Sequence, residues 1–103
     1  MNYSRFVAIG AMLENDSHRE RLMLAGMGLA GEAGEVCDLA KKTAFHGKVM
    51  DLDKMVEELG DVLWYFYLMT NLYGLDVEQI KEANIRKLCE RYPEQYGTAE
   101  DHL

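Results

Sequence analysis

Apolar residues recur along most of the chain at the three- and four-residue spacing that is typical of amphipathic helices. Between residues 18 and 45 they form one stripe when residues are placed about 100° apart, which predicts a long helix. Ser17 stands just before this stretch and Glu20 three residues later, which is the spacing of a capping box, and Gly47 can end the helix.

Three further helices are predicted from similar spacing and from residues that begin or end helices. Their expected ranges are from about Tyr3 to Leu13, from a cap at Asp51 or Asp53 to Leu72 before Gly74, and from a cap at Asp76 to the residue before Pro93. The connections are short, so the helices should pack as an antiparallel four-helix bundle, and the fold class is all-α. Residues 1–93 are expected to form one domain, and 94–103, with few apolar residues, a loosely ordered tail.

Composition narrows the class of protein further. The chain has 103 residues, 49% hydrophobic and 28% charged, as expected of one globular domain. Its net charge of −7 argues against nucleic-acid binding driven by phosphate neutralisation. Its two cysteines are too few for a secreted disulfide framework, and no apolar run is long enough to anchor it in a membrane. We therefore expect a cytoplasmic protein.

The third predicted helix carries an unusually wide apolar arc. The stretch Val62 to Met69 has no charged residue on any face. In so small a chain, this implies that the helix is buried on more sides than one four-helix monomer can cover. We expect a homo-oligomer, a dimer or larger, whose interface uses this helix.

Two pairs of carboxylates break the amphipathic pattern. Glu32 lies inside the apolar arc of the second helix with Glu35 at its edge, and Glu58 and Asp61 repeat this arrangement on the third. If the helices are antiparallel, the pairs converge on one volume, where two charges about 5 Å apart repel by about 3 kcal/mol at an effective dielectric of 20. Protons or cations must therefore compensate them. Oxygen ligands favour a hard ion such as Mg²⁺, which commonly takes phosphate oxygens as further ligands, so a phosphate-bearing substrate is a hypothesis.

The fourth predicted helix places polar groups where a core stripe is expected. Asn84, Lys87 and Arg91 share the stripe of Leu88. The two cations could hold an anionic ligand, or could neutralise the acidic pairs in a purely structural salt-bridge network. Glycines at positions 26, 28, 31 and 34 each cost a helix about 1 kcal/mol, which favours close approach of a neighbouring helix there.

Three sequence motifs together resemble the MazG-like nucleotide pyrophosphohydrolases of the all-α NTP-pyrophosphatase superfamily. They are Gly28-Leu29-Ala30-Gly31-Glu32-Ala33-Gly34-Glu35-Val36, Glu58-Leu59-Gly60-Asp61-Val62-Leu63-Trp64-Tyr65, and Asn84-Ile85-Arg86-Lys87-Leu88 followed by Arg91-Tyr92-Pro93. The resemblance covers roughly residues 3–93. It implies a helical bundle completed by a homodimer or homotetramer, and Mg²⁺-dependent hydrolysis of a nucleoside triphosphate to its monophosphate and pyrophosphate.

The resemblance also implies roles for individual residues. The four acids Glu32, Glu35, Glu58 and Asp61 would hold the metal, and either Glu32 or Glu35 would accept a proton from the attacking water. The residues that would bind the nucleotide are Lys41 or Lys42, Tyr65, Asn84, Lys87 and Arg91.

Two other functions are compatible with the same residues. One is a non-catalytic helical module for oligomerisation or regulation, in which the acids bind metal or basic side chains only structurally. The other is hydrolysis of a different phosphoanhydride, such as that of a phosphoribosyl nucleotide. The acidic motif alone does not separate these functions from hydrolysis of a nucleoside triphosphate.

Overall fold

A computed structural model describes residues 1–12 and 17–103 and divides the chain into two compact units, Met1–Tyr73 and Gly74–Leu103. Its elements are α1 (Tyr3–Met12), α2 (His18–His46), α3 (Leu52–Leu72), α4 (Val77–Arg91), α5 (Pro93–Tyr96) and the 3₁₀ turn η1 (Ala99–Asp101). The described residues contain helices and no strand, which confirms the all-α class. Leu13, the predicted end of the first helix, lies outside the described residues.

The long helix α2 begins and ends where its capping residues predict. The Ser17 hydroxyl accepts a hydrogen bond from the backbone N–H of Glu20 at 3.2 Å. At the other end, Gly47 adopts a left-handed conformation with φ of 65°, and its N–H binds the carbonyl of Lys42. A residue with a β-carbon is strained at this φ, which is why glycine ends the helix here.

The later helices are capped by aspartates. Of the two residues predicted to cap α3, it is Asp51 that does so, by accepting a hydrogen bond from the N–H of Lys54 at 3.0 Å. Asp76 caps α4 through the N–H of Glu78 at 3.0 Å. Gly74 follows α3 with φ of 63°, so the predicted end of that helix is confirmed.

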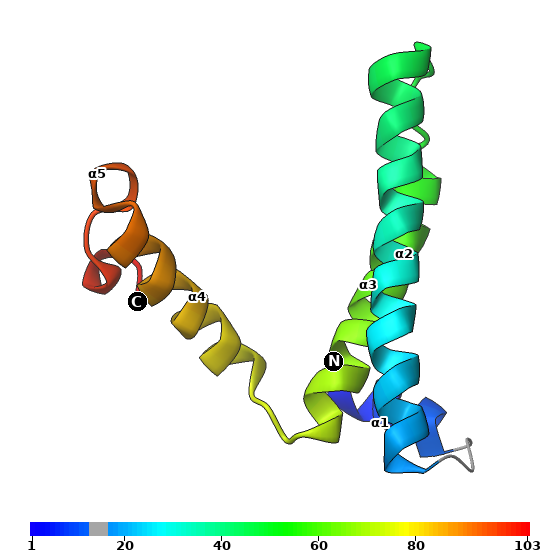
Figure 1. Cartoon of the computed structure of the whole chain (residues 1–103), viewed down its shortest axis with the longest axis horizontal. Coiled ribbons are helices and arrows are strands. Elements are labelled where there is room, and N and C mark those ends of the chain that lie inside the picture. Colours follow the sequence, from blue (N-terminus) through cyan, green and yellow to red (C-terminus); the bar gives the residue numbers. More distant parts are fainter. Residues whose placement is uncertain (13–16) are drawn as a thin grey trace. The chain divides into compact units, whose positions relative to one another are not determined.

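Helices α2 and α3 form an antiparallel hairpin in the first unit (Figure 1). Helix α1 packs against α3, and the side chains of Ser4 and Asn71 join them through a hydrogen bond of 2.6 Å. One buried side chain from each helix forms the centre of the core, surrounded by partly buried aromatic and aliphatic residues. These central residues are Val7, Ala25 and Leu68. The core thus fixes α2 against α3.

Four glycines of α2 were predicted to lie close to a neighbouring helix, and Gly28 makes such a contact. A β-carbon at Gly28 would collide with the aromatic ring of Tyr65. At Gly26 it would just reach Met69, at 4.0 Å, and at Gly31 and Gly34 it would meet nothing within 4 Å. The expectation of close packing is therefore confirmed at Gly28, whereas no residue that the structure describes approaches Gly31 or Gly34 in this way.

Part of the wide apolar arc of α3 stays exposed in the first unit. Leu59 and Leu63 are 51% and 44% exposed. With Leu29 of α2 and with Val62 and Phe66, they line an open apolar groove of about 570 Å³. Such a groove leaves apolar surface in contact with water, which is unfavourable in an isolated monomer.

In the second unit, α4 packs against the C-terminal segments. Both α5 and η1 contact α4, so residues 94–103 include short helical turns that lie against it. Thr98 caps the turn η1, and its backbone N–H donates a hydrogen bond of 3.2 Å to the carboxylate of Asp101. Across the part of the chain that the structure describes, no helix has both the length and the apolar character needed to cross a membrane.

Candidate functional site

Carboxylates from α2 and α3 converge in the first unit. One oxygen atom from each of Glu32, Glu58 and Asp61 lies within 4.8 Å of the other two. Glu58 and Asp61 are one helical turn apart on α3, and the antiparallel hairpin brings Glu32 of α2 opposite them. The predicted convergence of acids from both helices is therefore present for these residues.

Burial differs between the members of this acidic cluster. Glu58 is only 6% exposed, Glu32 is partly buried and Asp61 is exposed. Glu35, predicted to turn inward with Glu32, is exposed and lies outside the cluster. A separation of three residues turns its side chain by about 60° from Glu32 around the helix axis, which is enough to move it toward solvent.

The electrostatic environment disfavours a negative charge on Glu32. Burial raises the pKa of the Glu32 carboxyl, and the charges of Asp61 and Glu58, a hydrogen bond with Glu58 and the charge of Glu35 raise it further. Burial and then the charge of Asp61 also raise the pKa of Tyr3. Without a cation, the cluster holds more negative charge than its surroundings favour.

A basic residue that the sequence analysis did not single out contacts the cluster. The Lys54 ammonium lies 3.2 Å from Glu58 Oε1 and 3.5 Å from Glu57 Oε2. A hydrogen bond with Glu58 and the charge of Glu58 are the largest causes that raise the pKa of Lys54. Its signal in the sequence is the four-residue spacing from Glu58, which places the two side chains on one face of α3.

Two residues predicted to bind nucleotide lie in the first unit with other partners. Lys42 forms an ion pair with Asp38 at 3.0 Å. The ring of Tyr65 lies over Gly28 and meets Trp64 edge to face, with 5.1 Å between ring centroids. Tyr65 is thus fixed by packing one turn after Asp61, while Lys42 lies exposed on the last turns of α2.

The other predicted nucleotide-binding residues lie on α4. Asn84, Lys87 and Arg91 are all exposed in the second unit, whereas Leu88 is partly buried. Within this unit, Asn84 lines a pocket together with Leu88, whereas Lys87 and Arg91 lie exposed outside it. The inward stripe expected of α4 in a complete bundle stays a prediction.

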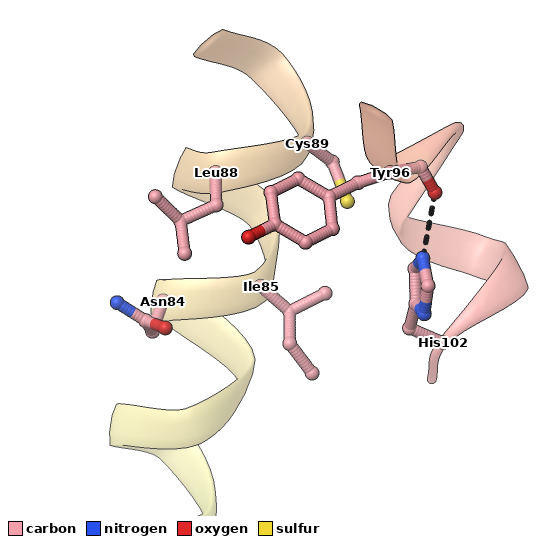
Figure 2. Close-up of a pocket in the computed structure, with 6 residues that line it drawn as sticks. All are labelled: Asn84, Ile85, Leu88, Cys89, Tyr96 and His102. Carbon is pink, nitrogen blue, oxygen red and sulfur yellow. Dashed lines mark hydrogen bonds between the residues drawn. The ribbon is translucent and has the colours of Figure 1, made fainter. Parts of the chain in front are cut away.

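A pocket of about 420 Å³ lies between α4 and the C-terminal segments. Figure 2 shows the Tyr96 ring across the apolar face of α4, with Asn84 at one side and His102 at the other. The His102 ring nitrogen Nε2 lies 2.7 Å from the Tyr96 carbonyl and holds the last residues against this pocket. Its remaining lining residues are Ile85, Leu88 and Cys89.

The donor set of the acidic cluster fits a divalent metal ion. Three carboxylates offer only oxygen atoms, which suits Mg²⁺ or Mn²⁺ better than the softer metals that prefer thiolate or imidazole. Their mutual repulsion would be relieved by a bound cation. In the metal-free protein, burial and then the charges of Asp61 and Glu58 raise the pKa of Glu32, so the site favours compensation of its negative charge.

Comparison with known proteins identifies the relatives of this chain. The family profile of the MazG nucleotide pyrophosphohydrolase domain matches residues 21–96, which include both acidic motifs and the α4 motif. The chain is also 34% identical, over 76 residues, to the Gene 37 protein of Mycobacterium phage L5, and this match covers 70% of the chain and 67% of the phage protein. No solved structure matches significantly.

Proposed function

Because the chain belongs to the MazG nucleotide pyrophosphohydrolase family, we propose that it hydrolyses ribo- or deoxyribonucleoside triphosphates to the monophosphate and pyrophosphate. The observation that carries this proposal is the convergence of Glu32, Glu58 and Asp61 within 4.8 Å. Acids gathered in this way are unfavourable unless a cation joins them, and a polyphosphate is the natural partner of a hard cation.

Glu32, Glu58 and Asp61 would hold Mg²⁺ for the cleavage of the bond between the α- and β-phosphates. A bound ion of this kind neutralises phosphate charge and lowers the pKa of a water molecule. Glu58 contributes a carboxylate that α3 keeps away from solvent, and Asp61 offers its oxygens from the exposed rim. The buried and exposed ligands together leave one side of the site open to substrate.

We assign the general base to Glu35. A general base must be free to accept a proton from water that attacks the α-phosphorus, and Glu35 is the motif acid outside the cluster. Its exposure keeps it accessible to water. Replacement by Gln should lower kcat while metal binding is retained, whereas replacement of Glu58 should remove both.

The basic and polar residues would bind the rest of the nucleotide. Lys87 and Arg91 are proposed to stabilise the triphosphate charge, with Asn84 beside them toward the nucleoside, and this assignment rests on their match to the third motif. Lys42 would reach a phosphate after leaving Asp38, and Tyr65 would contact the base or sugar.

The catalytic form is proposed to be a homodimer or homotetramer in which helices of several copies complete the bundle. The exposed Leu59 and Leu63 of the α3 groove support this, because burial of such residues against a second copy would remove apolar surface from water. A cytoplasmic location is part of the same proposal, as expected for an enzyme that acts on free nucleotides.

Product analysis tests the proposed reaction. The protein is incubated with a panel of nucleoside triphosphates in ¹⁸O-labelled water, with Mg²⁺ or with a chelator, and the products are identified by mass spectrometry. We expect monophosphate that carries ¹⁸O and unlabelled pyrophosphate, only when Mg²⁺ is present. Release of orthophosphate would indicate a different phosphohydrolase. Turnover of a phosphoribosyl nucleotide in place of triphosphates, or no turnover, would favour the alternative enzyme or the non-catalytic module.

A further inference from the structure

The ion pair between Lys54 and Glu58 differs from the other ion pairs of the chain. Among the residues that the structure describes, the pairs between Lys and carboxylate groups on one helix otherwise involve exposed acids, such as Asp38 at 43% and Glu78 at 77% side-chain exposure. The Glu58 side chain is 8% exposed, while that of Lys54 is 50% exposed. A buried carboxylate is thus matched with a half-exposed cation.

Burial makes this pairing important for Glu58. A buried carboxylate needs a compensating charge, because removal from water costs far more than an exposed ion pair gains. Two further carboxylates, Glu32 and Asp61, have oxygens within 4.8 Å of it and add repulsion. In the protein without metal, the Lys54 ammonium at 3.2 Å offsets part of this charge.

We propose that Lys54 acts through Glu58 as a counter-ion that the metal replaces: its ammonium neutralises the buried carboxylate in the metal-free protein, and the incoming ion displaces it. This inference rests on the proposed metal site. Lys54 lies four residues before Glu58, so its long stem reaches forward over one turn of α3, and its half-exposed side chain can turn toward solvent when it leaves.

The competition between Lys54 and the metal for Glu58 has one consequence for metal affinity and another for the stability of the fold. Lys54 competes with the metal for Glu58, so its removal should tighten binding of the ion. Lys54 also stabilises the metal-free fold, so its removal should lower the melting temperature until metal is added. If Lys54 were only an exposed surface residue, its removal would change neither the metal affinity nor the effect of metal on stability.

The test compares Lys54→Met, which keeps the length and apolar stem but removes the charge, with Lys54→Arg, which keeps the charge. Lys81→Met is the matched control, because Lys81 pairs with the exposed Glu78 on α4 at 2.9 Å. Binding of Mn²⁺ without nucleotide is measured by electron paramagnetic resonance, and melting temperature is measured with and without Mn²⁺. In the wild type, the lysine Nζ resonances are followed by ¹⁵N NMR during a Mg²⁺ titration.

We expect Lys54→Met to bind Mn²⁺ about tenfold more tightly than the wild type, from the loss of a unit positive charge beside a divalent ion. Mn²⁺ should raise its melting temperature by more than that of the wild type, while Lys54→Arg and Lys81→Met should resemble the wild type. In the wild type, Mg²⁺ should shift the Lys54 Nζ resonance, identified by its absence in the variants.

Equal Mn²⁺ affinity in Lys54→Met and the wild type, or an Nζ resonance that does not respond to Mg²⁺, would overturn the inference while leaving the metal site intact. Failure of the wild type itself to bind Mn²⁺ would instead refute the proposed metal site. The two failures are therefore distinguishable in one series of measurements.

Discussion

The contact between Gly28 and Tyr65 allows a quantitative prediction about the hairpin that carries the site. In Gly28→Ala, the new methyl group collides with the Tyr65 ring, which cannot retreat freely because it packs beside Trp64. Overpacking of this kind costs about 1–3 kcal/mol. Alanine returns about 1 kcal/mol through its higher helix propensity. The expected net effect is a loss of about 1 kcal/mol in the free energy of unfolding.

Gly34→Ala is the matched control on the same helix, because a β-carbon there meets nothing within 4 Å. It should gain up to about 1 kcal/mol from helix propensity alone. Urea unfolding can be followed by the fluorescence of Trp64, the one tryptophan of the chain. We expect the variants to differ by about 2 kcal/mol, or roughly 10 °C in melting temperature. Equal stability of the two variants would show that Tyr65 does not lie over Gly28, and would refute this account of the hairpin.

Three further predictions concern the acids and the apolar face. Glu58→Gln should abolish nucleotide hydrolysis with helical content unchanged by circular dichroism, and retained turnover would remove Glu58 from the metal site. Because the folded, metal-free protein raises the pKa of Glu32 above its ordinary value of 4.5, the unfolding free energy should fall as pH rises through the titration of that group. In chelator-treated Glu32→Gln, the unfolding free energy should fall less with rising pH than it does in the chelator-treated wild type. A pH profile of melting temperature equal to that of the wild type would contradict the raised pKa of Glu32. Leu63→Glu, at a position 44% exposed, should shift the molecular mass in light scattering toward the monomer, whereas an unchanged mass would place the interface elsewhere.

The helices were predictable from sequence because their ends depend on local chemistry. The side chains of Ser17, Asp51 and Asp76 bind backbone N–H groups two or three residues ahead, and Gly47 supplies a positive φ. These interactions lie within a few residues, so the pattern of residue types specifies them without knowledge of the tertiary fold.

The acidic cluster was predictable only in part because it depends on the crossing of two helices. Helical periodicity placed Glu32 and Glu58 toward the core, and both are withdrawn from solvent. It did not predict whether Glu35 faces the core. This residue lies at the edge of the apolar arc of α2, where a small rotation of the helix decides between core and solvent. Lys54 was missed because a basic residue four positions from an acid usually forms an exposed pair, and burial of its partner depends on the neighbouring helix.

The packing partners of α4 were not predictable from sequence, for a different reason. Periodicity shows which residues share a face but does not show what packs against that face. Leu88 and Cys89 are covered by the C-terminal residues around Tyr96 and His102, a segment too polar to be expected as a packing partner. The exposure of Lys87 and Arg91 follows from how little of α4 that segment covers.

The central claim is that Glu32, Glu58 and Asp61 form one divalent metal site, and paramagnetic NMR tests it most directly. Substoichiometric Mn²⁺ is added to ¹⁵N-labelled protein, and broadening of the backbone amide signals is mapped along the chain. We predict that the amides of these acids broaden first, before those of exposed acids such as Glu78 and Glu94. Uniform broadening over all acidic residues, or none at the cluster, would contradict the account.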